Sequence, residues 1–146
     1  MFLKELNKEE AIAFINLVSI LADVDNEFAK EEKVLLKEYK EELEIEEKEI
    51  YNLKYDDIME VIRKSSDRSK RIIYFELVGL SLVDGEYEDK EVYFLENLAS
   101  ELKISRATKI SIANYFYNFT DVYNFTTVDA ENNIKLLKEQ AERILR

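Results

Sequence analysis

Apolar residues recur along this chain at intervals of three and four positions, which is the spacing of one face of an α-helix. Between Lys8 and Val24 the spacing is sustained over several turns and predicts a first helix. The positions expected to face inward there are Ile12, Ile15, Val18, Leu21 and Ala22. Because the chain has no Pro and only two Gly, it leaves little room for the turns of a β-structure, and we predict an all-α fold.

The same spacing predicts the remaining helices. They are expected at about 30–43, 55–66, 68–83, 89–102, 106–119 and 129–146, and 44–53 is compatible with a further short helix. Ser105 is a suitable N-cap for the helix that begins at Arg106. The inward positions predicted for two of these helices are Ile58, Val61 and Ile62, and Ile134, Leu137, Ala141 and Ile144. We therefore expect a bundle of seven or eight helices.

The chain also resembles itself. When the sequence is shifted by 59 positions, nine of the 25 residues from Leu21 to Ile45 are identical, where chance gives roughly two. The identities begin at Leu21/Leu80 and end at Ile45/Ile104. We predict a duplicated helical hairpin with pseudo-twofold packing, with repeat units at about 12–53 and 71–119. The helix at about 129–146 completes a single domain that spans 1–146.

Composition narrows the function. With 32 Asp and Glu against 21 Lys and Arg, the net charge is −11, so a nucleic acid or an anionic membrane surface is an unfavourable partner. The chain has neither Cys nor His, which excludes disulfides, thiol chemistry and imidazole or thiolate metal sites. The N-terminus has no signal-peptide pattern and no apolar stretch is long enough to span a bilayer, so we expect a cytoplasmic protein without direct membrane insertion.

Two acidic segments, 25–32 and 84–91, occupy the equivalent breaks between helices of the two repeats. Their repeated carboxylates are Asp25, Glu27, Glu32, Asp84, Glu86 and Glu91. One interpretation is helix punctuation, in which the Asp side chains form Asx-turns and the Glu side chains favour the start of the next helix. The other is a hard-cation site, because Ca²⁺ and Mg²⁺ prefer oxygen ligands. Neither segment has the spacing of an EF-hand loop.

The segment 114–125 holds three Phe and three Tyr. As core it offers two adjacent helical faces, one with Ile112, Phe116 and Phe119 and the other with Ile110, Ala113 and Tyr117. As a docking groove it would use aromatic anchors, which are common at interfaces. The residues expected to remain outside and to contact a protein partner are Tyr115 and Tyr123.

The stretches "SLVDGEYEDKE" (81–91) and "ILADVDNEFAKEE" (20–32) resemble the helix–Asp-Gly-x–helix units of the TerB-like family of tellurite-resistance clusters. The N-terminal domain of the DjlA co-chaperone is similar. Asn26 stands where the family pattern has Gly, and the resemblance extends from about residue 8 to 119. It implies the helical fold, a role for the acidic positions and divalent-cation binding.

No nucleophile elbow, phosphate-binding glycine loop or metal-binding triad occurs in the sequence. We therefore expect a non-enzymatic acidic binding module. The resemblance implies work in a tellurite-resistance or stress-response assembly, with protein partners that can be membrane-associated and with Ca²⁺ or Mg²⁺ as the only candidate cofactors. The alternative is a hard-metal-dependent hydrolase or a pure divalent-cation sensor that uses the acidic segments.

Overall fold

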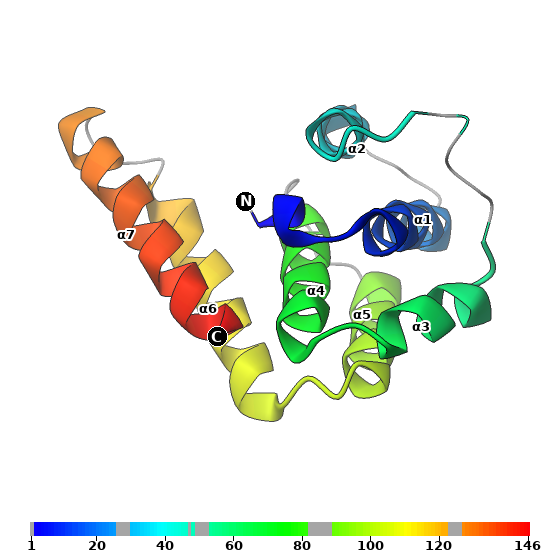
Figure 1. The fold of residues 1–146 in the computed structure, drawn as a ribbon. Helices are drawn as coiled ribbons and strands as arrows, with labels where there is room; N and C mark the ends of the chain where they lie inside the picture. The colour runs from blue at the N-terminus through cyan, green and yellow to red at the C-terminus, as the bar shows by residue number, and fades with distance from the viewer. Residues whose placement is uncertain (1, 26–29, 47, 49–52, 82–88, 123–126) are drawn as a thin grey trace. The chain divides into compact units, whose positions relative to one another are not determined.

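The computed structural model describes residues 2–25, 30–46, 48, 53–81, 89–122 and 127–146, and for 23–25, 30–33, 35, 119–122 and 127–134 it describes the backbone alone. Within these residues the fold consists of helices and contains no strand, so the predicted all-α class is confirmed (Figure 1). The elements are η1 (Leu3–Glu5), α1 (Lys8–Asp25), α2 (Lys30–Glu42), α3 (Tyr55–Arg63), α4 (Asp67–Ser81), α5 (Asp89–Glu101), α6 (Arg106–Val122) and α7 (Thr127–Leu145).

The chain divides into two compact units, Met1–Lys103 and Ile104–Arg146, and each is described by itself. Unit 1 holds η1 and α1 to α5, and unit 2 holds α6 and α7. The single domain expected over 1–146 stays a prediction.

Helix α1 is the centre of unit 1. It packs against α2, α3 and α5, while α4 packs against α5 and η1. Because it has neighbours on several sides, α1 is buried around most of its circumference and not only along one stripe. Its buried side chains include Phe14, Ile15, Leu17 and Val18, none of which is exposed at all.

Two helices of unit 1 begin with equivalent N-caps. At the start of α1, the backbone N–H of Glu10 donates to Asn7 Oδ1 at 2.9 Å and the N–H of Asn7 donates to Glu10 Oε1 at 3.0 Å, which is a capping box. At the start of α4, the N–H of Ser69 donates to Ser66 Oγ at 3.1 Å. Asn7 and Ser66 are 59 positions apart, the same shift that aligns the sequence with itself.

The ends of α2 and α5 are also equivalent. Glu44 and Lys103 follow these helices in the left-handed region, each with a φ of 55°. Each closes its helix with the same bond, from the Glu44 N–H to Glu41 O at 3.2 Å and from the Lys103 N–H to Ser100 O at 3.2 Å. Both pairs are again 59 positions apart, and so are the bounds of α2 and α5.

A glycine at either left-handed position is expected to stabilise the protein. A side chain with a Cβ disfavours this conformation, so Lys103→Gly should raise the free energy of unfolding by about 0.5–1 kcal/mol. Chemical denaturation measures the change. The control is Lys37→Gly, an exposed position inside α2, which should lose about 1 kcal/mol. Equal losses in both variants would contradict the assigned helix end.

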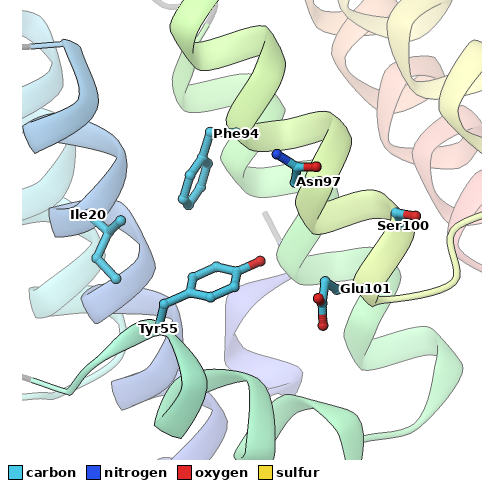
Figure 2. A pocket seen from close by; sticks show the side chains of 6 residues that line it. All are labelled: Ile20, Tyr55, Phe94, Asn97, Ser100 and Glu101. Carbon is cyan, nitrogen blue, oxygen red and sulfur yellow. The ribbon is translucent and has the colours of Figure 1, made fainter.

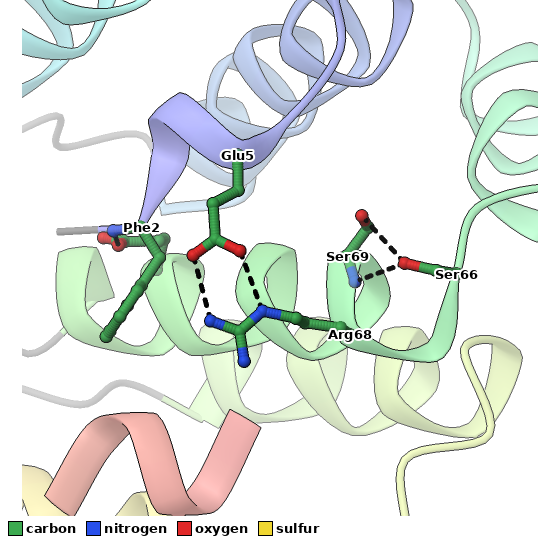
Figure 3. A network of polar contacts seen from close by, with 6 residues as sticks. Phe2, Glu5, Ser66, Arg68 and Ser69 are labelled. Carbon is green, nitrogen blue, oxygen red and sulfur yellow. Dashed lines mark hydrogen bonds and ion pairs between the residues drawn. The ribbon is translucent and has the colours of Figure 1, made fainter. Parts of the chain in front are cut away.

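The N-terminal segment is fastened to α4 (Figure 3). The backbone N–H of Phe2 donates to the buried carboxylate of Glu76 at 3.2 Å, and the Phe2 ring meets Phe75 edge-on at 6.2 Å between centroids. Arg68 donates to both carboxylate oxygens of Glu5, at 2.8 and 3.0 Å, and its guanidinium lies 5.9 Å from the centre of the Phe2 ring. Two charged side chains of α4, Arg68 and Glu76, and the ring of Phe75 thus hold the N-terminal segment on this helix.

The Glu5–Arg68 pair predicts a small pH dependence. The hydrogen bonds from Arg68 lower the pKa of the Glu5 carboxyl below its ordinary value of 4.5. A lowered carboxyl pKa stabilises the fold above the unfolded-state value and loses that contribution as pH falls through the folded-state value. Because both side chains are partly exposed, Glu5→Gln should cost at most about 1 kcal/mol near neutral pH. The difference from the parent protein should shrink below about pH 4.5 in urea titrations; a constant difference would contradict the pairing.

In unit 2, α6 and α7 pack against each other. The predicted cap of α6 is confirmed, because the N–H of Thr108 donates to Ser105 Oγ at 3.1 Å. On α7, Leu137 and Ala141 are buried as expected, and Leu145 is buried as well.

Two expectations about α6 were wrong. Tyr115 was expected outside, but it is buried, with 3% of its surface exposed, and its ring meets Phe116 edge-on. Tyr117 and Ile110 were assigned to an inward face, but they are 77% and 50% exposed. The helix buries the face that carries Ile112 and Tyr115 instead.

Candidate functional site

Most residues of the two acidic segments lie outside the part of the chain that the structure describes. Glu27, Asp84 and Glu86 are not described, and Asp25 and Glu32 are described by their backbones alone, at the last residue of α1 and in the first turn of α2. Among the residues described, no three Asp or Glu side chains gather as metal ligands do. The cation site at these residues therefore stays a prediction.

Glu91 is the one member of the set with a described side chain. It lies in the first turn of α5, as expected, where a carboxylate complements the helix dipole. Its exposed fraction is only 2%, so it does not belong to a solvated acidic surface. It therefore differs from the exposed Asp89 in the same turn.

A pocket of about 690 Å³ opens between α1, α3 and α5 in unit 1 (Figure 2). We call it the Tyr55 pocket. It is lined by Ile20, Tyr55, Phe94, Asn97, Ser100 and Glu101. The rings of Tyr55 and Phe94 meet edge-on at 6.1 Å between centroids and form an aromatic wall. Figure 2 shows the Tyr55 hydroxyl turned toward the side of α5 that carries Asn97 and Glu101.

The polar groups of the Tyr55 pocket come almost entirely from one helix. Asn97, Ser100 and Glu101 recur at intervals of three and four residues, so α5 presents an amide, a hydroxyl and a carboxylate along one face. Within the described part of the chain, the side chains of Asn97 and Ser100 make no hydrogen bond. The pocket thus offers several hydrogen-bonding groups beside an aromatic wall, which is the usual make-up of a ligand site.

Glu101 is the one charged residue among the six that line this pocket. Glu101 Oε2 accepts a hydrogen bond from Arg63 Nη2 at 2.8 Å, and both side chains are substantially exposed. Partial burial, and next the negative charge of Glu101, raise the pKa of the Tyr55 hydroxyl. Tyr55 therefore keeps its proton at neutral pH and can both donate and accept.

Sequence reasoning did not single out this pocket. Tyr55 and Phe94 are 39 positions apart and each reads as an ordinary member of a helix. Periodicity gives the face of a helix but not which helices meet, so the only available signal was Phe94 beside the small polar residues Asn97 and Ser100 on α5.

Charge is distributed unevenly between the two units. Residues 1–103 hold 27 Asp and Glu against 15 Lys and Arg, a net charge of −12, whereas 104–146 hold five against six, a net charge of +1. Near α3, a second groove of about 310 Å³ includes the exposed carboxylates of Glu9, Asp57 and Glu60. The acidity of the protein thus belongs to unit 1.

Comparisons with protein-family models, curated proteins and solved structures found no match to this chain. None of the helices in the described parts of the chain is long and apolar enough to cross a membrane.

Proposed function

We propose that unit 1 is a duplicated helical hairpin of the TerB-like type. The support is local geometry that repeats at the same shift of 59 positions as the sequence. The caps at Asn7 and Ser66, the left-handed residues Glu44 and Lys103, and the bounds of α2 and α5 all follow that shift. These coincidences delimit repeats of about 7–44 and 66–103, which are shorter than the units expected from sequence alone. The pseudo-twofold packing and the TerB-like resemblance belong to this proposal.

The function that unit 1 supports best is non-enzymatic docking of a cationic protein partner. The observation that carries it is the net charge of −12 concentrated in residues 1–103. Charge of one sign over a folded surface attracts partners of the opposite sign and speeds their association. On the TerB-like resemblance we extend the proposal to docking within a tellurite-resistance or stress-response assembly of the cytoplasm, in which membrane-associated proteins are candidate partners.

The experiment is a calorimetric titration of the full chain with a short peptide in which lysine alternates with glycine, and with the glutamate counterpart. The lysine peptide should bind at low salt and lose affinity as salt rises, because exposed charges are screened. The glutamate peptide should not bind. Asp57→Asn/Glu60→Gln should weaken binding, whereas Glu139→Gln/Glu142→Gln in unit 2 should leave it unchanged. No binding of the lysine peptide at low salt would contradict the proposal.

The divalent-cation part of the proposal concerns the two acidic segments. Calorimetric titration of chelator-treated protein with Ca²⁺, then Mg²⁺, tests it beside an Asp25→Asn/Asp84→Asn variant. Saturable micromolar binding that the variant loses is the expected result for a built site. Millimolar binding that the variant retains would contradict a cation site. The segments would then serve only to end one helix and begin the next.

A further inference from the structure

We propose that the Tyr55 pocket binds the guanidinium group of an arginine side chain supplied by the basic partner. This inference rests on the proposed function and specifies the residue type that the partner presents. It is carried by three features of the pocket: an aromatic wall, a cluster of acceptor groups and a single carboxylate.

The aromatic wall suits a planar cation. A guanidinium stacks on aromatic faces and is attracted by their quadrupole, and arginine does this more often than lysine. Tyr55 comes from α3 and Phe94 from α5, so both rings are held by helices that pack on α1 (Figures 1 and 2). Ile20 of α1 adds an aliphatic surface for the arginine stem.

The acceptors match the donors of the same group. A guanidinium carries five N–H donors and no acceptor. Glu101 Oε1, Asn97 Oδ1, Ser100 Oγ and the Tyr55 hydroxyl can each accept a hydrogen bond, and they line one opening. The compact ammonium of lysine has three donors and would reach fewer of these groups at once.

The single carboxylate distinguishes this pocket from a merely acidic surface. At positions 59 residues earlier, α2 carries Glu38, Glu41 and Glu42 where α5 carries Asn97, Ser100 and Glu101. The second hairpin thus has two neutral hydrogen-bonding groups in place of two carboxylates. A neutral lining around one carboxylate favours recognition of one cation with defined geometry over general attraction of positive charge.

The structure already places a guanidinium beside this carboxylate. Arg63 Nη2 donates to Glu101 Oε2 at 2.8 Å, while Oε1 accepts no hydrogen bond in the described part of the chain. An incoming arginine can therefore bind Oε1 beside Arg63 or displace it. In the first case the positive charge of Arg63 repels the ligand beside it, and in the second Arg63 competes for the carboxylate. Removing Arg63 and removing the carboxylate should therefore have opposite effects.

The test uses the full chain, isotope-labelled for NMR, and a capped glycine–serine peptide with one central arginine. A second peptide carries citrulline, the neutral isostere of arginine, at the same position. The arginine peptide should shift the side-chain amide signal of Asn97 and the backbone signal of Tyr55 with a Kd on the order of 1 mM. The citrulline peptide should bind about tenfold more weakly, because it lacks the charge.

Two variants and one matched control complete the test. Glu101→Gln should weaken binding of the arginine peptide about fivefold or more, and Arg63→Gln should tighten it about two- to fivefold. Glu42→Gln, the same charge change at the equivalent end of α2, should leave the affinity unchanged. All three positions are on the surface or half-buried, and unchanged spectra elsewhere verify their folds.

Equal affinity for arginine and citrulline, or equal effects of Glu101→Gln and Glu42→Gln, would overturn the arginine site. If the lysine peptide still binds unit 1 in a salt-dependent manner, the proposed docking function stands without it. If neither the lysine peptide nor the arginine peptide binds, both proposals are wrong.

Discussion

Replacing Phe14 with alanine is expected to lower the free energy of unfolding by about 3–5 kcal/mol, the largest effect we predict for a single substitution. Phe14 lies on α1, has no exposed surface and meets the ring of Tyr39 on α2 edge-on at 5.4 Å between centroids. The substitution removes the aromatic contact and leaves a cavity at the α1–α2 contact, because surrounding helices relax only partly into such a space.

Urea denaturation followed by circular dichroism measures this loss. The matched control is Tyr93→Ala, which also truncates an aromatic ring on a helix but at a position that is 72% exposed. The control should change the free energy by no more than about 0.5 kcal/mol. A loss below about 1 kcal/mol for Phe14→Ala would show that α1 is not the core of unit 1.

The second large effect is expected at Asn16, a polar side chain buried within the apolar helix α1. Its Nδ2 donates to Ile12 O at 2.8 Å and its Oδ1 accepts from the backbone N–H of Leu53 at 3.1 Å. Asn16→Leu keeps the number and branching of the side-chain heavy atoms but leaves the Leu53 N–H without its acceptor. An orphaned partly buried donor costs about 1–3 kcal/mol, and we expect a loss in that range.

Amide hydrogen exchange locates this effect as well as measuring it. The Leu53 amide should exchange much faster in Asn16→Leu than in the parent protein, whereas the amide of Ile15 should change only with global stability. Asn114→Leu, at an exposed position of α6, is the control and should be nearly neutral. Unchanged exchange at Leu53 would contradict the bond between Asn16 and the segment that precedes α3.

Helices and their ends were largely readable from the sequence. The predicted start at Lys8, the cap at Ser105 and the bounds of α5 agree with the structure to within a residue. These features depend on local chemistry, namely apolar spacing and side chains that satisfy the free N–H groups of a first turn. The same locality explains why the 59-residue shift found in the sequence reappears in the caps.

Which side of a helix is buried was less readable where both sides are apolar. On α6, Tyr117 and Tyr115 compete for the interior, and the structure buries Tyr115. On α3, Ile58 and Ile62 are buried as predicted. Met59 is buried although it was not predicted to be, whereas Val61, which was, is half-buried. These choices depend on the positions of neighbouring helices, about which periodicity carries no information.

The two candidate sites also differ in how far the sequence reveals them. The acidic segments stand out in the sequence because they repeat, yet of their six carboxylates only Glu91 has a described side chain, and it is buried. The Tyr55 pocket has no sequence signature because α1, α3 and α5 contribute to it from distant positions. It became visible only when the packing of these helices was known.

The central claim is that unit 1 is the docking surface for a basic partner. The most direct test is to follow backbone amide shifts of the full chain while the lysine–glycine peptide is added at low salt. We predict shifted amide signals within residues 2–103, including those near Asp57 and Glu60. The signals of residues 104–146 should shift by no more than they vary between samples without peptide. Shifts concentrated in α6 and α7, or no shifts at any peptide concentration, would contradict the claim.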